Sequence, residues 1–342
     1  MPSTILGYVL RRLLQLIPTV FFVLTITFIL SRVLPGNPAV ALLGPKATPE
    51  NIRKLSEALG LDKPIWFQYL IYLKDLSKLD LGTSYIFRVP VINLLMERLP
   101  ASLELTVAGV IIATLIGIPL GVLSAKMRNS ILDHFTRVSG VIGVSIPVIW
   151  IGLVFQIIFG LILGLPVEGR IDPTLKPRSI TGSIILDSLL DGNIPGLMSS
   201  LEHLLLPAFV LSLPLIGLVM RMVRASMLEI LTMDYIRTAR MKRLPENVIL
   251  YKHALKNALI PTITVIGLYF AILVTGEVLT EVIFSWPGIG RLIYEAIMAR
   301  DYAVIQGTVL FISIIYILTN LAVDILYFYI NPQIRGELYG GE

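Results

Sequence analysis

The chain alternates long apolar runs with shorter polar segments. Six runs contain no Asp, Glu, Lys or Arg. An α-helix rises ~1.5 Å per residue, so ~20 residues cross a ~30 Å hydrocarbon core. The runs are uniformly apolar rather than alternating, which favours helices over barrel strands. They are Leu13–Ser31, Leu105–Ala125, Val138–Val167, His203–Met220, Asn257–Gly276 and Tyr302–Val323. The pattern predicts an all-α, polytopic membrane bundle of six transmembrane helices.

The polar segments between the runs predict how the chain is divided. The first run exceeds the ~7–15 apolar residues of a signal peptide, so we interpret it as a retained helix. The long segment that follows has helix start and stop signals at Thr48, Pro49 and Gly60, which predict a partly helical cap. The predicted parts are the N-terminus with the first transmembrane helix over 1–31, an external cap over 32–104, a five-helix core over 105–330 and a cytoplasmic tail over 331–342.

The cap also contains aromatic residues between Pro64 and Leu70. Trp and Tyr are common where a membrane meets water, because their rings are apolar and their tips are polar. This composition indicates that part of the cap lies near the membrane surface.

Composition and charge agree with a membrane protein. Hydrophobic residues make up 55% of the chain and charged residues only 15%, against ~25% in soluble domains. Lys and Arg gather in segments 126–137 and 221–256 and are sparse in 277–301. By the positive-inside rule, both termini are expected in the cytoplasm and the protein in the cell membrane. The net charge of +5 is therefore attributed to orientation rather than to nucleic-acid binding. The chain has no cysteine, which excludes disulfides and Cys-ligated metals.

Catalytic and nucleotide-binding motifs are missing. The sequence has no phosphate-binding G-x-x-x-x-G-K-[ST], no H-E-x-x-H and no G-x-S-x-G. We therefore expect no enzyme activity and no cofactor or metal bound by this chain. An acidic pair in mid-span, expected of an ion-coupled carrier, is also missing. Glu277 and Glu281 lie beside the end of the fifth run. They either reach the lipid headgroups or line the outer mouth of a pathway.

The segment between the fourth and fifth runs is the most informative. Residues Asp234–Lys242 predict a short helix with an acidic start and a basic end, which suits the helix dipole. Tyr235, Thr238, Ala239 and Lys242 share one face at helical spacing, and the small Thr238 and Ala239 permit close approach by a partner surface. A solvated basic loop near anionic lipid is the alternative. The candidate docking residues are Asp234, Tyr235, Arg237, Thr238, Ala239, Arg240, Lys242, Arg243 and Leu244.

This segment resembles the EAA loop of ATP-binding-cassette importer permeases. The dipeptide/oligopeptide permease family has roughly D-Y-x-R-T-A-R-x-K-G-L, then H-A-L-R-N-A-L-x-P. Further matches occur in order along nearly the whole chain. They include Leu34-Pro35-Gly36-Asn37-Pro38, Asp80-Leu81-Gly82-Thr83-Ser84, Phe284-Ser285-Trp286-Pro287-Gly288 and Asn331-Pro332-Gln333-Ile334-Arg335. One position departs, because Arg243 stands where the family has Gly. A Gly there favours a left-handed turn, which costs Arg ~1 kcal/mol or more. Either the turn differs, or contacts offset that cost.

The resemblance implies a subunit of a heteromeric importer. A second, similar permease would complete the pathway, two ATPase subunits would bind ATP and Mg, and an external binding protein would deliver the solute. Residues 221–256 would form the cytoplasmic ATPase-docking loop. The family mostly takes up di- and oligopeptides, and similar permeases handle nickel complexes, glutathione or oligosaccharides. A self-sufficient channel or ion-coupled carrier is the alternative from another class, and it predicts transport without ATP.

Overall fold

A computed structural model describes residue 14 and residues 18–30, 38–44, 47–58, 60–78 and 80–330. These residues form helices joined by turns and loops, and their single β-bridge joins Thr83 and Pro90. The predicted tail 331–342 and the start of the first predicted helix lie outside the described residues. The all-helical prediction is confirmed for the part of the chain that the structure describes.

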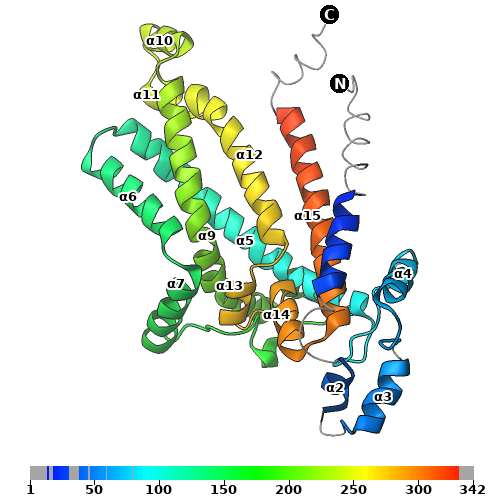
Figure 1. Ribbon diagram of the computed structural model, residues 1–342. Coiled ribbons are helices and arrows are strands. Elements are labelled where there is room, and N and C mark those ends of the chain that lie inside the picture. Colours follow the sequence, from blue (N-terminus) through cyan, green and yellow to red (C-terminus); the bar gives the residue numbers. More distant parts are fainter. Residues whose placement is uncertain are drawn as a thin grey trace, which may run out of the picture.

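The N-terminal helices are short, and the long helices α5, α9 and α15 follow later in the chain. After a helix at Pro18–Leu30, the elements are α2 (Pro38–Leu43), α3 (Pro49–Ala58), α4 (Ile65–Leu76), α5 (Val91–Lys126), α6 (Ile131–Ser145), α7 (Val148–Phe155), η2 (Gln156–Ile162), η3 (Pro173–Leu175), α8 (Ile184–Leu190), α9 (Ile194–Ile230), α10 (Asp234–Met241), α11 (Glu246–Val248), η4 (Ile249–Ala254), α12 (Leu255–Val274), α13 (Val278–Ile283), α14 (Ile289–Ala299) and α15 (Tyr302–Ile330). Figure 1 shows α10 at one end of the molecule and α2 and α3 at the other.

Four stretches of the described chain are long and apolar enough to cross a membrane: α5, α9, the continuous helix Glu246–Val274, and Tyr302–Leu326 of α15. The helix Pro18–Leu30 is apolar but shorter. These helices make the protein a multi-pass membrane protein. They coincide with four of the six predicted runs.

The predicted run Val138–Val167 does not form one straight span. α6 ends at Ser145, α7 begins at Val148, and the two helices meet at an angle of 101°. Pro147 cannot donate a helical hydrogen bond, and it forces Ile146 into an extended conformation, with ψ of 131°. Counted as one span, this bent pair brings the number of candidate spans in the described residues to five.

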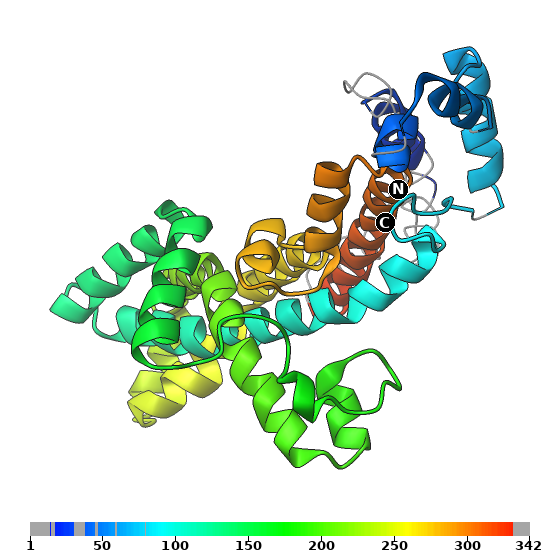
Figure 2. The ribbon, with the colours of Figure 1, turned by 90° about the horizontal axis from the view of Figure 1, so that it is seen from below.

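The longest helices extend beyond the apolar runs. α5 has 36 residues and α9 has 37, so each is ~55 Å long and exceeds a ~30 Å hydrocarbon core. Residues 91–104, assigned to the cap from sequence, form the first turns of α5. Figure 2 shows α5 running across the molecule, with helices from the later part of the chain on both sides of it.

Glycines allow α5, α6 and α9 to approach closely. A Cβ atom at Gly121 of α5 would lie 2.8 Å from the Met220 carbonyl oxygen, and one at Gly217 of α9 would lie 2.5 Å from the Gly140 carbonyl oxygen. Real Cβ atoms do not come this close to backbone atoms, so side chains at these crossings would separate the helices. Small residues at crossings are typical of membrane helices, which associate by van der Waals packing.

We predict that Gly217→Ala destabilises the protein by about 1–3 kcal/mol, because overpacking must displace the α6 backbone. Gly109→Ala is the matched control. There the new Cβ would meet the Leu211 side chain at 3.1 Å, which can rotate, and Ala gains up to about 1 kcal/mol of helix propensity over Gly. The measurement is the free energy of unfolding in mixed micelles. Equal effects of the two substitutions would contradict the packing explanation.

Candidate docking site and buried polar junctions

α10 is a short exposed helix that follows directly on the end of α9. Asp234 lies in its first turn and Arg240 in its last turn, as the helix dipole favours. The Arg237 Nη1 atom lies 3.2 Å from Asp234 Oδ1 on the exposed surface. The predicted helix over Asp234–Lys242 is thus present, and it ends one residue earlier, at Met241.

The turn after α10 is left-handed, although its residue is Arg rather than Gly. Arg243 has φ of 54°. The Leu244 N–H donates to the Ala239 carbonyl at 3.3 Å, as in a common helix C-terminal motif. Arg240 reaches across the turn to Glu246, with Nη2 and Oε1 3.0 Å apart. The turn expected of a Gly is therefore kept, and the ion pair is a contact that offsets part of its strain.

One face of α10 packs onto the rest of the chain. Ile236 is fully buried and Ala239 is 8% exposed, and both belong to the core cluster that includes Met227 of α9 and Ile249 of η4. The Asn257 side chain of α12 donates to the Tyr235 hydroxyl at 2.9 Å. Movement of α10 would therefore be transmitted directly to α9 and α12.

The opposite face of α10 is exposed. Thr238, Met241 and Lys242 lie on it, and Met241 is 75% exposed. The sequence placed Ala239 on the partner-facing side, but the structure turns it inward, where its small size fits the internal packing. Met241 was not among the predicted residues and lies on the free surface. Helical spacing alone did not show which half of the helix faces inward.

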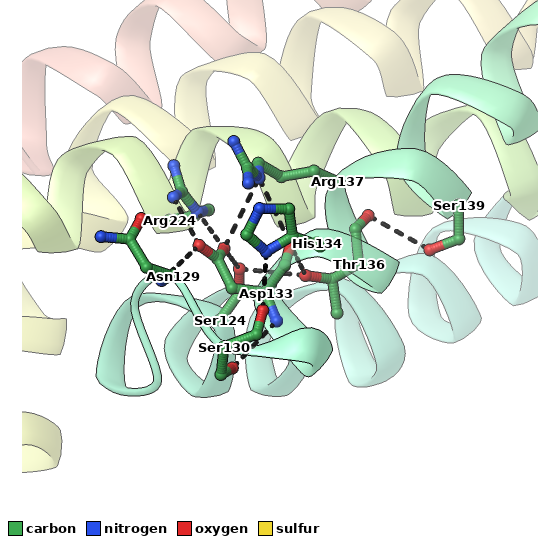
Figure 3. Close-up of polar contacts among 9 residues, drawn as sticks. All are labelled: Ser124, Asn129, Ser130, Asp133, His134, Thr136, Arg137, Ser139 and Arg224. Atoms are coloured by element: carbon green, nitrogen blue, oxygen red, sulfur yellow. Dashed lines mark hydrogen bonds and ion pairs between the residues drawn. The ribbon is translucent and has the colours of Figure 1, made fainter.

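A buried ion pair joins α6 to α9 (Figure 3). Asp133 has a fully buried side chain and binds Arg224 through two contacts, Nε to Oδ1 at 2.6 Å and Nη2 to Oδ2 at 2.9 Å. The Ser124 hydroxyl at the end of α5 donates to the same carboxylate at 2.6 Å. The Asn129 backbone N–H adds a fourth bond at 3.0 Å. We call this set of contacts the Asp133 junction.

The Asp133 junction lies beside the core that holds α10. Val122 and Ala125 flank Ser124 on α5, and Met227 follows Arg224 by three residues on α9; all three belong to the cluster of Ile236 and Ala239. Sequence analysis counted the basic residues here only as orienting charges. The sequence does not predict this pair, because its members are 91 residues apart. No local pattern distinguishes a buried Asp from an exposed one in a segment of mixed charge.

Glu281 is the centre of a second junction, at the other end of the bundle. Its side chain is buried and accepts hydrogen bonds from the Ser102 hydroxyl at 2.7 Å and from the Arg291 backbone N–H at 2.9 Å. The Ser102 oxygen in turn accepts from the Ile289 N–H at 2.8 Å. Together they cap the N-terminus of α14 and tie it to α5. The Trp286 indole donates to the Ala101 carbonyl at 2.7 Å and strengthens the attachment.

The two predicted pathway residues thus have different surroundings. The Glu281 side chain is buried and enclosed by α5 and α14, so it does not line an open surface of the described residues. Glu277 precedes α13 and is partly exposed. Burial raises the pKa of both carboxyls, that of Glu281 to about 7.

Glu104 of α5 forms a third junction near the second one. It is paired with Arg170, and it accepts from the Ser183 hydroxyl at 2.6 Å. The Arg170 guanidinium lies 5.8 Å from the Trp286 ring centre. The segment 168–202, which contains Arg170 and Ser183, is therefore fixed to α5 near the Glu281 junction.

We predict that Asp133→Asn destabilises the protein by about 3 kcal/mol or more, because it leaves Arg224 partly buried without a counter-charge. The double variant Asp133→Leu/Arg224→Met should recover much of the loss, since it removes both charges. Asp234→Asn, at the exposed pair with Arg237, should cost less than about 1 kcal/mol. Unfolding in mixed micelles measures all three, and a double variant no more stable than the single one would contradict the role of the pair.

We predict that the free energy of unfolding falls as pH rises from about 4.5 to about 7. The folded protein holds the Glu281 proton up to pH about 7, whereas an unfolded Glu releases it near its ordinary pKa. Within that window the folded state binds more protons, so stability falls with pH. Glu281→Gln should weaken this dependence and leave the smaller contribution of Glu277, whereas Glu246→Gln, on an exposed side chain, should not change it. A dependence unchanged in Glu281→Gln would assign it to another group.

Two family models match the chain. Residues 117–336 match the model described as binding-protein-dependent transport system inner membrane component. Residues 5–106 match the model of the N-terminal part of such membrane components.

Several relatives are similar over almost their whole length. The dipeptide transport system permease protein DppB of Alkalihalophilus pseudofirmus is 45% identical, over 96% of this chain and 99% of the relative. The probable D,D-dipeptide transport system permease protein DdpB of Escherichia coli K12 is 44% identical, over 97% and 98%. DppB of Escherichia coli K12 is 41% identical, over 96% and 99%. By sequence and by its apolar helices, the chain belongs to the family of binding-protein-dependent transport system inner membrane components.

Proposed function

We propose that this chain is a permease subunit of an ATP-driven importer of di- and oligopeptides. The observation that supports this most is its similarity, at 41–45% identity over nearly the full chain, to proteins named dipeptide transport system permeases. The chain would be non-catalytic and would bind no cofactor. ATP and Mg would be bound by partner ATPase subunits, and the chain would supply half of the pathway.

The proposed assembly holds a second, homologous permease, two ATP-binding-cassette ATPases and an external binding protein. The chain would cross the cell membrane six times, with Pro18–Leu30 as part of the first span and the bent pair α6–α7 as the third. Both termini would be cytoplasmic, on the side of α10. The end that contains α2 and α3 would then face outward as a cap.

The exposed face of α10 is the surface that we propose for ATPase docking. Thr238, Met241 and Lys242 project from a helix whose other face is fixed in the core of α9 and α12. A push on this face would move these long helices as rigid bodies, and the Asp133 junction would make α6 follow. The helix bundle would then rock between inward- and outward-open states. For a near-complete switch, ATP must bind one of these states more tightly than the other by ~5 kcal/mol.

We predict that Thr238→Trp lowers substrate-stimulated ATP hydrolysis by the assembled complex at least about tenfold, which corresponds to ~1.4 kcal/mol of coupling. Thr238 is exposed, so the large side chain blocks docking without disturbing the core. Ala239→Asp would be a poorer test, because it puts a charge into the internal packing. The measurements are ATPase activity and co-purification of the ATPase subunits.

Thr174→Trp is the matched control, because Thr174 of η3 is also an exposed Thr and lies far from α10 in the sequence. It should leave co-purification of the ATPases unchanged. Equal hydrolysis by Thr238→Trp and the unmodified complex would exclude this docking surface. Uptake by liposomes that contain only this chain, without ATP, would instead favour a self-sufficient channel or carrier.

The identity of the solute is tested by measuring which ligands the external binding protein binds, because that protein does most of the solute selection in such systems. Dipeptides are the expected ligands. Selective binding of a nickel complex, glutathione or an oligosaccharide would keep the importer mechanism and replace the peptide assignment.

A further inference from the structure

α4 (Ile65–Leu76) has its apolar side chains on the outward side, the reverse of a helix in a soluble domain. Its outward side carries large apolar residues: Trp66 is 65% exposed and Leu70 is 55% exposed, and Ile65 at the start of the helix is also exposed. A soluble helix buries such residues and exposes polar ones. An apolar outer face of this kind requires either a protein partner or lipid.

The inward side of α4 is mostly polar. Gln68, Tyr72 and Asp75, together with Ile71, line a cavity of about 190 Å³ that also borders Gly82 and Tyr302. Within the described residues, the Tyr72 hydroxyl and the Gln68 Oε1 have no hydrogen-bond partner. Water in this cavity would satisfy them. The polarity of α4 is thus reversed, with its water-seeking groups toward the protein and its apolar groups outward.

The contacts of α4 place it beside an apolar helix. The Tyr69 hydroxyl and Thr25 Oγ1 are 2.6 Å apart, and the Phe28 ring packs on Tyr69 and Tyr72 with ring centres 5.1 and 5.5 Å away. Thr25 and Phe28 belong to the apolar helix Pro18–Leu30, which lies close to the candidate span α15 in both views (Figures 1 and 2). The outward side of that helix is also apolar, with Phe22 65% exposed.

The ends of α4 have the composition of an interfacial helix. Lys63 precedes it and lies over the Phe67 ring, with Nζ 4.9 Å from the ring centre. Lys74 lies in its last turn. A Trp on the outer face between two Lys suits the boundary between acyl chains and anionic headgroups, where Lys extends toward water and Trp prefers the interface.

We propose that α4 is seated in the lipid bilayer, in the leaflet on the side away from α10, with Trp66 and Leu70 among the lipids. In the orientation proposed above this is the outer leaflet, so α4 would be a membrane anchor rather than part of a water-exposed cap. The lipid-facing surface of Pro18–Leu30 continues onto α4. By this arrangement the cap segments α2 and α3 are held at the membrane surface, next to the mouth of the bundle.

Spin-label accessibility tests the proposal directly, because the chain has no native cysteine. Leu70→Cys is labelled in the assembled complex and reconstituted into phosphatidylethanolamine/phosphatidylglycerol liposomes. Collisions with apolar oxygen and with water-soluble nickel-EDDA are measured. Lys54→Cys on α3, where the side chain is 65% exposed, is the matched aqueous control. The oxygen-to-nickel collision ratio should be severalfold higher at position 70 than at position 54.

Two results would overturn the proposal. Equal nickel access at positions 70 and 54 would place α4 in water. Exclusion of both reagents at position 70 would mean that protein, such as the second permease or the binding protein, covers this face. Trp66→Cys provides a second site on the same face if Leu70→Cys fails to assemble. Retained substrate-stimulated ATP hydrolysis shows that each labelled complex is folded and active. Failure of the α4 proposal can therefore be distinguished from failure of the proposed importer function.

Discussion

The close approach of α5 and α9 is the contact on which the rest of the structure depends. In a bilayer, helices gain little from burying apolar surface against one another, since lipid is equally apolar. Gly109, Gly117 and Gly121 of α5 lie against α9, and Gly217 of α9 lies against Gly140 of α6. Backbone contact at these glycines brings the helices near enough for short polar side chains to join them. The buried polar junctions are a consequence of this packing.

Those junctions lie at the two ends of the bundle. At the α10 end, Asp133 joins α6 to α9 and Ser124 adds α5, beside the core that holds Ile236 and Ala239. At the other end, Glu281 and Glu104 tie α14 and the segment 168–202 to α5. α5 is common to both ends. A force applied at α10 would therefore reach the far loops through continuous helices and fixed contacts rather than through flexible links.

Hydrogen bonds and opposite charge explain how this protein keeps acidic side chains buried. Removing a carboxylate from water costs several kcal/mol unless hydrogen bonds and opposite charge replace the hydration. Asp133 has Arg224, a hydroxyl and a backbone N–H. Glu281 has a hydroxyl and backbone N–H groups but no cation, which is why burial raises its pKa. The two sites therefore respond differently to pH.

The fold class, the positions of most apolar helices and the short helix that starts at Asp234 could be predicted from the amino-acid sequence, because these follow from local hydropathy and end signals. The family could be predicted too, because many short motifs occur in the right order. Other features required the three-dimensional arrangement: Pro147 bends the third run, Ala239 faces inward and Met241 outward, Glu281 is enclosed, and Asp133 meets Arg224. These depend on which faces of distant helices meet, and a local pattern holds no information on residues 91 positions apart.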